Sequence, residues 1–326
     1  MTRYIGKEMS RVDGVAKVTG RAKYAAEFQV PNLAYGFIVL GTVAKGTIKS
    51  IDTKEAESSP GVIRVFTHLN APKLGPKSST EDSPPRATEE RDKSFRALQS
   101  DRIYFNAQPV ALVVAETYEQ ARYASRLVRV SYNVEKHMTD TEAVRGRARV
   151  PSQGPPPKPR GNPEEAMKTA PVKVEAEYRI AMEHHNAMEP HAAIAVWQGD
   201  KLSIFDKTQE VYGVRKHLAS SFLIPEENVS VVSPYVGGAF GSSLRPNYYP
   251  SLTAMAAREI KRPVKVVYTR TQMFTGHGYR PYTMQKIALG AERSGKLTAM
   301  IHEAVHNTST FEEFSDNTTG FTRQVY

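Results

Sequence analysis

A proline-, glycine- and arginine-rich stretch near the middle of the chain is the feature that most limits how this sequence can fold. Residues 145–163 read RGRARVPSQGPPPKPRGNP and show no hydrophobic period. Such segments are extended and semi-rigid, because proline fixes φ and has no amide hydrogen to donate. We therefore expect two folded regions, residues 1–144 and 166–326, joined by a linker over residues 145–165. A chain of 326 residues is long enough for this division.

The first region mixes apolar strands with a helix. Residues 109–115 read PVALVVA, which predicts a buried strand with proline at its tolerated first position. A helix is expected over residues 117–127, with Thr117 as its N-cap and Gln120 three positions later. Residues 72–91 are rich in proline, serine and charge, and predict a surface loop. Further strands are predicted over residues 34–42, 62–67 and 128–134.

The second region predicts an α+β arrangement rather than a regular βαβ alternation. A helix over residues 209–222 places four apolar side chains on one stripe, and a second helix covers residues 249–259. No helix is predicted at the end of the chain. Strands are expected over residues 172–181, 192–197, 201–205 and 229–232, and a hairpin over 283–292 and 296–307 around Ser294-Gly295.

The chain contains no cysteine. This excludes disulfide bonds, thiolate zinc sites, cysteine nucleophiles and iron–sulfur ligation by these residues. If the protein takes part in redox chemistry, the electron relay must therefore be carried by another chain.

The net charge of +10 raises nucleic acid as a partner, but the positive residues are spread along the chain. The densest basic group lies in residues 145–160 and has no interleaved aromatic residues, so we expect no nucleic-acid binding. No run approaches the roughly 18–20 apolar residues of a membrane helix, and the N-terminus has no apolar core like that of a secretory signal. The expected location is the cytoplasm, or the periplasm by co-export with a partner that carries a signal.

A glycine loop at residues 237–241, GGAFG, is the first candidate site. It follows a strand-like run and precedes a helix, so the amides near Gly238 and Gly241 could approach an anion or an oxo group closely. The spacing fits neither the dinucleotide fingerprint nor a Walker A loop, and a purely structural turn explains it equally well. A large side chain between glycines, Phe240, is unusual in a plain turn.

The pair Thr208-Gln209 is the second candidate, at the junction of a predicted strand and helix. The Gln209 amide could simply cap the helix, or it could donate a hydrogen bond to a ligand oxygen.

The third candidate is the segment 183–191, EHHNAMEPH, which holds three imidazoles and two carboxylates. Its spacing matches neither H-E-x-x-H nor H-x-x-E-H, and Pro190 breaks any helix that would align His185 with Glu189. We therefore expect loop residues near a cavity rather than direct metal ligands.

Five segments, taken in order, resemble the molybdenum-binding large subunit of the xanthine dehydrogenase/aldehyde oxidase family, and in particular bacterial aldehyde oxidoreductases. The resemblance runs along essentially the whole chain. The matching segments are residues 11–26, 108–117, 188–200, 234–242 and 262–271.

This resemblance implies an α/β hammerhead domain over residues 1–144, then the first part of a molybdenum cofactor-binding α+β domain over residues 166–326. Relatives of this kind continue for roughly as many residues again. The second half would carry the catalytic glutamate, so no catalytic residue is expected on this chain. Many relatives also have lysine where this chain has Ser243.

The resemblance also implies a chemistry, the hydroxylation of an aldehyde or an N-heterocycle with water-derived oxygen. A molybdenum-bound hydroxide attacks, a glutamate acts as base, and hydride passes to a sulfido ligand. The implied cofactor is molybdopterin cytosine dinucleotide with molybdenum. Gln209 would hydrogen-bond the apical oxygen on the metal, and Phe240 and Gly241, beside Gly238, would pack at the centre.

The implied partners are an iron–sulfur subunit, an FAD subunit and a C-terminal half of the large subunit. Electrons would leave through the iron–sulfur clusters to FAD. By this interpretation the isolated chain is inactive. The alternative is an inactive fragment or scaffold that binds partner subunits without catalysis.

Overall fold

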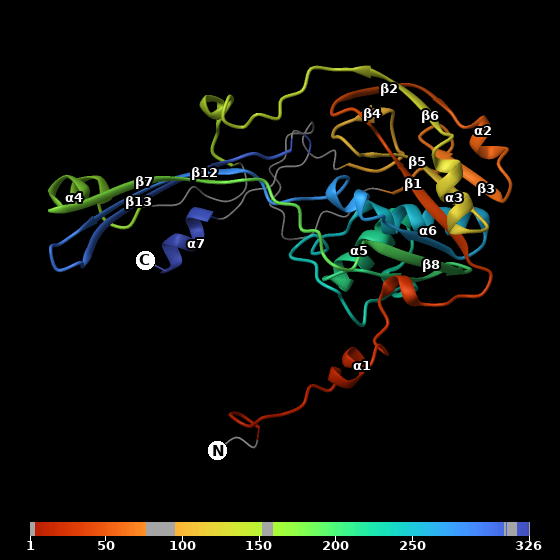
Figure 1. Ribbon diagram of the computed structural model, residues 1–326, viewed down its shortest axis with the longest axis horizontal. Helices are drawn as coiled ribbons and strands as arrows, with labels where there is room; N and C mark the ends of the chain where they lie inside the picture. Colours follow the sequence, from red (N-terminus) through yellow and green to blue (C-terminus); the bar gives the residue numbers. More distant parts are fainter. Residues whose placement is uncertain (1–3, 76–94, 152–158, 310, 312–317, 326) are drawn as a thin grey trace.

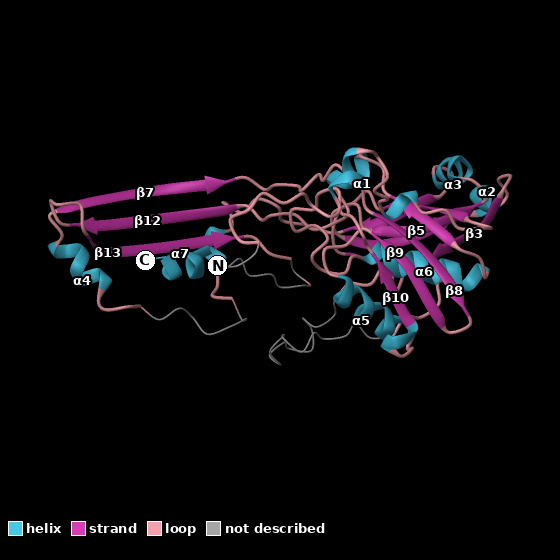
Figure 2. Ribbon diagram, turned by 90° about the horizontal axis from the view of Figure 1, so that it is seen from below, coloured by secondary structure: helices cyan, strands magenta, loops and turns pink. Residues whose placement is uncertain are grey.

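The computed structural model describes residues 4–75, 95–151, 159–309, 311 and 318–325. Its strands and helices form two bodies that lie side by side along the long axis and are joined by extended segments (Figures 1 and 2). A short helix, α1 (Gly14–Val18), extends away from the larger body near the N-terminus (Figure 1). The part of the chain that the structure describes has no helix long and apolar enough to cross a membrane.

The larger body is built on a seven-stranded mixed sheet with the order β10-β9-β8-β11-β1-β5-β3. Strands from both halves of the sequence share this sheet, because β1 pairs in parallel with β11 at Ala34 and Val264. The strands are β1 (Ala34–Leu40), β3 (Val62–Thr67), β5 (Pro109–Ala115), β8 (Ala192–Gln198), β9 (Lys201–Asp206), β10 (Val229–Val232) and β11 (Val264–Val267).

Two long helices, α5 (Val211–Phe222) and α6 (Tyr248–Ile260), pack on the strands that come from the second half of the sequence. Helix α5 buries Val214, Leu218 and Phe222, three of the four apolar residues predicted for its stripe. Helix α6 is buried from residue 249 to residue 257 and packs on β8. The indole of Trp197 donates a hydrogen bond to the Ala254 carbonyl, which joins β8 to α6 at 2.9 Å.

Helix α3 (Tyr118–Ser125) packs on β1 and β5, and short α2 (Lys54–Glu57) lies beside β3. The predicted capping box is confirmed, because Thr117 Oγ1 accepts from the Gln120 amide while the Gln120 side chain accepts from the Thr117 amide. A small sheet of β4 (Arg102–Ile103), β2 (Gly46–Asp52) and β6 (Arg129–Val134) completes this end of the larger body.

The smaller body is a three-stranded antiparallel sheet with the order β13-β12-β7. The predicted hairpin is confirmed as β12 (Thr283–Ala291) and β13 (Leu297–His306), and β7 (Val172–Ile180) forms one edge. Helix α4 (Pro163–Thr169) packs on this sheet, with Asn162 as its N-cap (Figure 2). Helix α7 (Thr318–Val325) contacts β13, so the expectation of no helix at the end of the chain was wrong.

The chain crosses from the larger body to the smaller one in the region of the linker predicted at residues 145–165. After β6 the chain runs to the smaller body for α4 and β7, and then returns to the larger body for β8. A single-turn 3-10 helix spans Arg145–Arg147, while residues 152–158 of the predicted linker and 76–94, which include most of the predicted surface loop, lie outside the described residues. The sheet of the larger body is therefore completed only by residues on both sides of the linker.

Candidate functional site

The glycine loop connects β10 to α6 on the side of the larger body that faces the smaller one. Three of its residues have positive φ angles, which are 86° at Gly238, 57° at Phe240 and 102° at Gly241. A positive φ is strained for phenylalanine, so the surrounding contacts must hold the loop in place. The Phe240 ring is nevertheless 73% exposed. Gly238 lies beside this ring, since a Cβ there would be 3.4 Å from Phe240 Cε2.

Gln209 follows β9 and meets the glycine loop directly. The Gly241 amide donates a hydrogen bond to Gln209 Oε1 at 3.2 Å. Gln209 does not cap α5, because Glu210 is the N-cap and its side chain accepts from the Tyr212 amide at 3.2 Å. Of the two roles open for Gln209 in the sequence, the capping role therefore belongs to its neighbour.

Two further hydrogen bonds, both to Ser243, join the Thr208-Gln209 segment to the chain just after the glycine loop. The Ser243 carbonyl accepts from the Gln209 amide at 2.9 Å and from Thr208 Oγ1 at 3.2 Å. The structure thus brings Gln209, Phe240 and Gly241 together although more than 30 residues separate the two segments. We call Gln209 and Gly241, with Phe240 beside them, the cradle.

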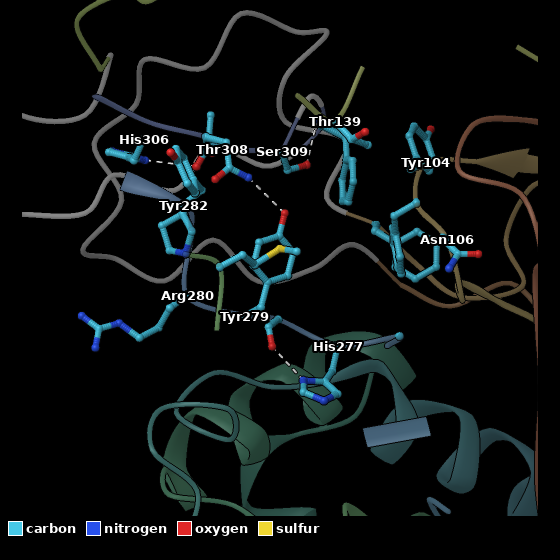
Figure 3. A pocket seen from close by; sticks show the side chains of 18 of the residues that line it. Tyr104, Asn106, Thr139, His277, Tyr279, Arg280, Tyr282, His306, Thr308 and Ser309 are labelled. Carbon is cyan, nitrogen blue, oxygen red and sulfur yellow. Dashed lines mark hydrogen bonds between the residues drawn. The ribbon is translucent and has the colours of Figure 1, made fainter. Parts of the chain in front are cut away.

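A large open cleft, with a cavity volume of about 2190 Å³, lies beside the cradle and between the two bodies. Phe240 and Gly241 line one wall together with His184 and His185. The segment that leads into β12 lines another wall, and Figure 3 shows its residues His277, Tyr279, Arg280 and Tyr282 beside the cavity. Tyr104 and Asn106 lie at the right of the view in Figure 3.

Four histidines gather at this end of the cleft, and His184, His185 and His277 line it. The His191 ring lies 5.0 Å from that of His277, and the His184 and His185 rings lie 6.4 Å and 6.5 Å from it. Burial lowers the pKa of His184, His185 and His191, so these three rings are neutral near pH 7. In the described ranges of the chain, no group of three or more potential ligands is arranged to hold a metal ion. His184 and His185 are loop residues that line the cavity.

Glu189 ties the histidine segment to the glycine loop. Its Oε2 accepts a hydrogen bond from the Gly237 amide at 2.6 Å. Burial raises the pKa of this carboxyl, although the bond from Gly237 opposes the shift. In the sequence, Glu189 could be interpreted only as a possible metal ligand, because no local pattern shows that residues 189 and 237 meet.

Two buried ionisable residues that the sequence did not single out, Asp206 and Lys207, come immediately before Thr208-Gln209. Asp206 is the last residue of β9 and Lys207 follows it; they are 1% and 0% exposed. Burial raises the pKa of Asp206 to about 7 and lowers that of Lys207. The Lys207 ammonium donates to Ser243 Oγ at 3.1 Å. The available signal in the sequence was an acidic and then a basic residue at the end of an apolar strand, just before Thr208-Gln209.

The donor groups of the cradle suit a negatively polarised oxygen. The Gln209 side chain is exposed, and its Nε2 group has no hydrogen-bond partner within the described ranges. Backbone and amide donors of this kind stabilise developing negative charge without carrying a charge themselves. None of these three residues is a general base.

Comparison with protein families gives two matches. The sequence model for the molybdopterin cofactor-binding domain matches residues 149–325. The model for the a/b hammerhead domain of aldehyde oxidase and xanthine dehydrogenase matches residues 19–136.

Curated relatives cover nearly all of this chain. The chain is 39% identical over 305 residues to the aldehyde oxidoreductase molybdenum-binding subunit PaoC of Escherichia coli (strain K12), covering 93% of the chain and 40% of the relative. It is 27% identical over 308 residues to the xanthine dehydrogenase molybdenum-binding subunit of Escherichia coli O157:H7, covering 92% and 41%. The chain therefore spans about 40% of the length of these relatives.

Solved structures share the fold. The aldehyde oxidoreductase from Desulfovibrio gigas superposes with a TM-score of 0.76 at 25% identity, covering 91% of this chain and 34% of that one. The quinoline 2-oxidoreductase from Pseudomonas putida 86 gives a TM-score of 0.78 at 23% identity, covering 92% and 39%. The α+β class and the hammerhead domain predicted from the sequence are confirmed.

Proposed function

The chain belongs to the xanthine dehydrogenase/aldehyde oxidase family of molybdopterin-binding large subunits, and from that premise we propose that its cradle forms one wall of a molybdenum cofactor site. The complete subunit would oxidise an aldehyde or an N-heterocycle with oxygen derived from water. We propose molybdopterin cytosine dinucleotide as the form of the cofactor. The single observation that carries the proposal is the contact between Gln209 Oε1 and the Gly241 amide at 3.2 Å.

The cradle fits such a group because it offers two donors, the Gln209 side-chain amide and the Gly241 backbone amide, and Gly241 lines the open cavity. Gln209 Nε2 is available to an oxygen, and the Gly241 amide is held by a contact that an incoming acceptor could replace. Gly241 is exposed, and a Cβ added to it would meet His185 Nε2 at 3.6 Å, so the glycine keeps the backbone approachable. Bound molybdenum would supply the redox and oxygen-transfer chemistry.

This chain's own residues would bind, orient and exclude water. The amides of Gln209 and Gly241 would orient an acceptor oxygen, and the exposed Phe240 ring would keep water from one side of a flat substrate. The neutral imidazoles of His184 and His185 add polar but uncharged surface to the same wall. No residue of this chain is proposed as the catalytic base.

The proposed partners follow from what the chain lacks. Without cysteine it cannot ligate an iron–sulfur cluster, so electrons would leave through an iron–sulfur subunit to an FAD subunit. The remaining part of the large subunit would close the cleft from the opposite side and supply the base. The cleft between the two bodies supports this proposal, since its volume of about 2190 Å³ leaves room for a further wall.

The test is metal analysis by mass spectrometry on the protein purified from its native host with whatever co-purifies. Stoichiometric molybdenum, together with a further chain that completes the subunit, is the expected result and would justify screening aldehydes and heterocycles. Absence of both molybdenum and a partner chain would contradict the proposal. That outcome would favour a scaffold without catalysis.

A further inference from the structure

Lys207 is a buried cation that the proposed chemistry does not use. Its side chain is completely buried, although lysine is almost never buried unless paired. The backbone on both sides is fixed, because the Lys207 amide donates to the Ala192 carbonyl at 3.1 Å and the Lys207 carbonyl accepts from Tyr249 Oη at 3.0 Å. The ammonium therefore occupies a built position rather than a chance conformation.

The charge of Lys207 is poorly balanced in this position. Its recorded partner is the neutral hydroxyl of Ser243, at 3.1 Å. Within the ranges that the structure describes, no ion pair within 4.0 Å involves Lys207. Glu189 and Asp206 act on it only at longer range, and Glu189 already accepts from the Gly237 amide. A buried cation without a close anion costs stability unless something else supplies negative charge.

Ser243 connects this ammonium to the cradle. Its hydroxyl accepts from Lys207, while its carbonyl accepts from the Gln209 amide at 2.9 Å and from Thr208 Oγ1 at 3.2 Å. Ser243 lies two residues after Gly241, so the positive charge sits directly behind the atoms proposed to face the cofactor. The neighbouring ring of His191, 3.5 Å from Ser243 Oγ, is neutral and adds no charge there.

We propose that Lys207 is the buried counter-charge for the anionic molybdenum cofactor, a positioning residue that acts through Ser243 on the cradle. The inference rests on the proposed function. A molybdopterin cofactor carries negative charge on its thiolates and phosphates, which a nearby buried cation attracts. The arrangement explains why the chain keeps an expensive charge at this position: its cost in the empty protein is offset when the anion binds.

The test compares two readouts in the purified complex. The first is molybdenum bound per chain, and the second is the urea midpoint of the cofactor-free chain. Lys207→Met removes the charge and keeps the apolar length of the side chain. Lys265→Met is the matched control, because it removes a half-buried lysine of β11 that donates to the Ala26 carbonyl and not to Ser243.

Lys207→Met should lower bound molybdenum on the order of tenfold, because one favourable charge–charge interaction is lost. The urea midpoint of the empty chain should stay or rise, because a buried charge has been removed. Lys265→Met should leave molybdenum unchanged, and Lys207→Arg should restore part of the loss. A fall in metal without a fall in stability is a result that a merely structural lysine cannot give.

Other outcomes overturn the inference. Unchanged molybdenum in Lys207→Met would do so, and so would a parallel loss of molybdenum and stability, since both assign the lysine to the fold. If Lys207→Met does not fold, Lys207→Gln keeps a donor to Ser243 and gives the same two readouts; if neither variant folds, the charge serves the fold. Wild-type protein without molybdenum would instead refute the proposed function, and that result is read before any variant is made.

Discussion

Gly36 of β1 faces Val266 of β11 so closely that a Cβ on the glycine would lie 2.7 Å from Val266 Cγ2. This contact lies where strands from the two family domains join one sheet. Gly36→Ala should therefore destabilise the protein by about 1–3 kcal/mol, since valine is stiff and has little room to move. Because β1 joins the strands of the two family domains in one sheet, the loss of stability should affect both domains.

The single tryptophan makes this measurable, because Trp197 lies in β8, on the far side of β11 from β1. In Gly36→Ala, the urea midpoint followed by tryptophan fluorescence and the one followed by circular dichroism should shift by the same amount. Gly146→Ala is the control, since a Cβ there meets nothing within 4 Å. Two separate transitions would show that the shared sheet does not couple the regions.

Gly241→Ala should reduce cofactor retention through backbone strain. Gly241 has a φ of 102°, which an alanine adopts at a cost of about 1–2 kcal/mol. Gly295→Ala is a matched control, because Gly295 has a φ of 91° in the exposed β12–β13 turn. The two variants should lose similar stability in urea, whereas only Gly241→Ala should lose molybdenum. Equal metal content in both would remove Gly241 from the site.

Gln209→Ala should weaken molybdenum retention and the activity of the complex without unfolding the chain. The side chain is exposed and caps no helix, so its loss should change the free energy of unfolding by no more than about 0.5 kcal/mol. Gln198→Ala, at the exposed end of β8, removes a glutamine away from the cradle. Unchanged metal content and unchanged rate in Gln209→Ala would argue against any role for this amide at the metal.

Relative to the wild type, Asp206→Asn should stabilise the chain, and this gain in the free energy of unfolding should increase as the pH rises. The pKa of Asp206 is about 7 in the folded chain against 3.8 when unfolded, so between those values the folded chain holds a proton that the unfolded chain releases. Its contribution to stability therefore falls as pH rises through that window. The gain from Asp206→Asn should be small near pH 4 and grow to the order of 4 kcal/mol above pH 7.

The control for this experiment is Asp200→Asn, in the exposed turn between β8 and β9. Urea midpoints of the three proteins at several pH values isolate the Asp206 effect from that of the buried histidines, which is common to all of them. A pH-independent difference between Asp206→Asn and wild type would mean that this carboxyl does not hold its proton in the folded state.

Local patterns were enough to predict most of the elements. The capping box at Thr117, the all-apolar strand at residues 109–115 and the Ser294-Gly295 hairpin each carry their signal within a few residues. The strand over residues 264–267 was not predicted, because VKVV is short and its burial depends on β1 and β8. Helix α7 was missed for a similar reason, since its sequence TTGFTRQV has weak helix formers.

Only part of the candidate site could be predicted from the sequence. Resemblance to a family directed attention to Gln209, Phe240 and Gly241, while their residue types alone allowed a plain turn and a helix cap. The contact between residues 209 and 241 spans a helix and a strand, so no local rule contains it. Lys207 was overlooked because a lysine after a strand ordinarily lies in solvent, and only the packed structure shows its burial. The linker at residues 145–165 remains a prediction as a domain boundary.

The edge strand β7 leaves one row of backbone donors and acceptors open along the smaller body. An open edge of nine residues invites a second chain to add to the sheet. Charged residues alternate along one face of this strand as Lys173, Glu175, Glu177 and Arg179, and the last three form ion pairs with Lys286, Arg145 and Glu142. In an antiparallel pairing of two such strands over their full length, lysine would meet arginine and glutamate would meet glutamate. The edge therefore discourages the chain from polymerising with itself while remaining open to a strand with a different charge order.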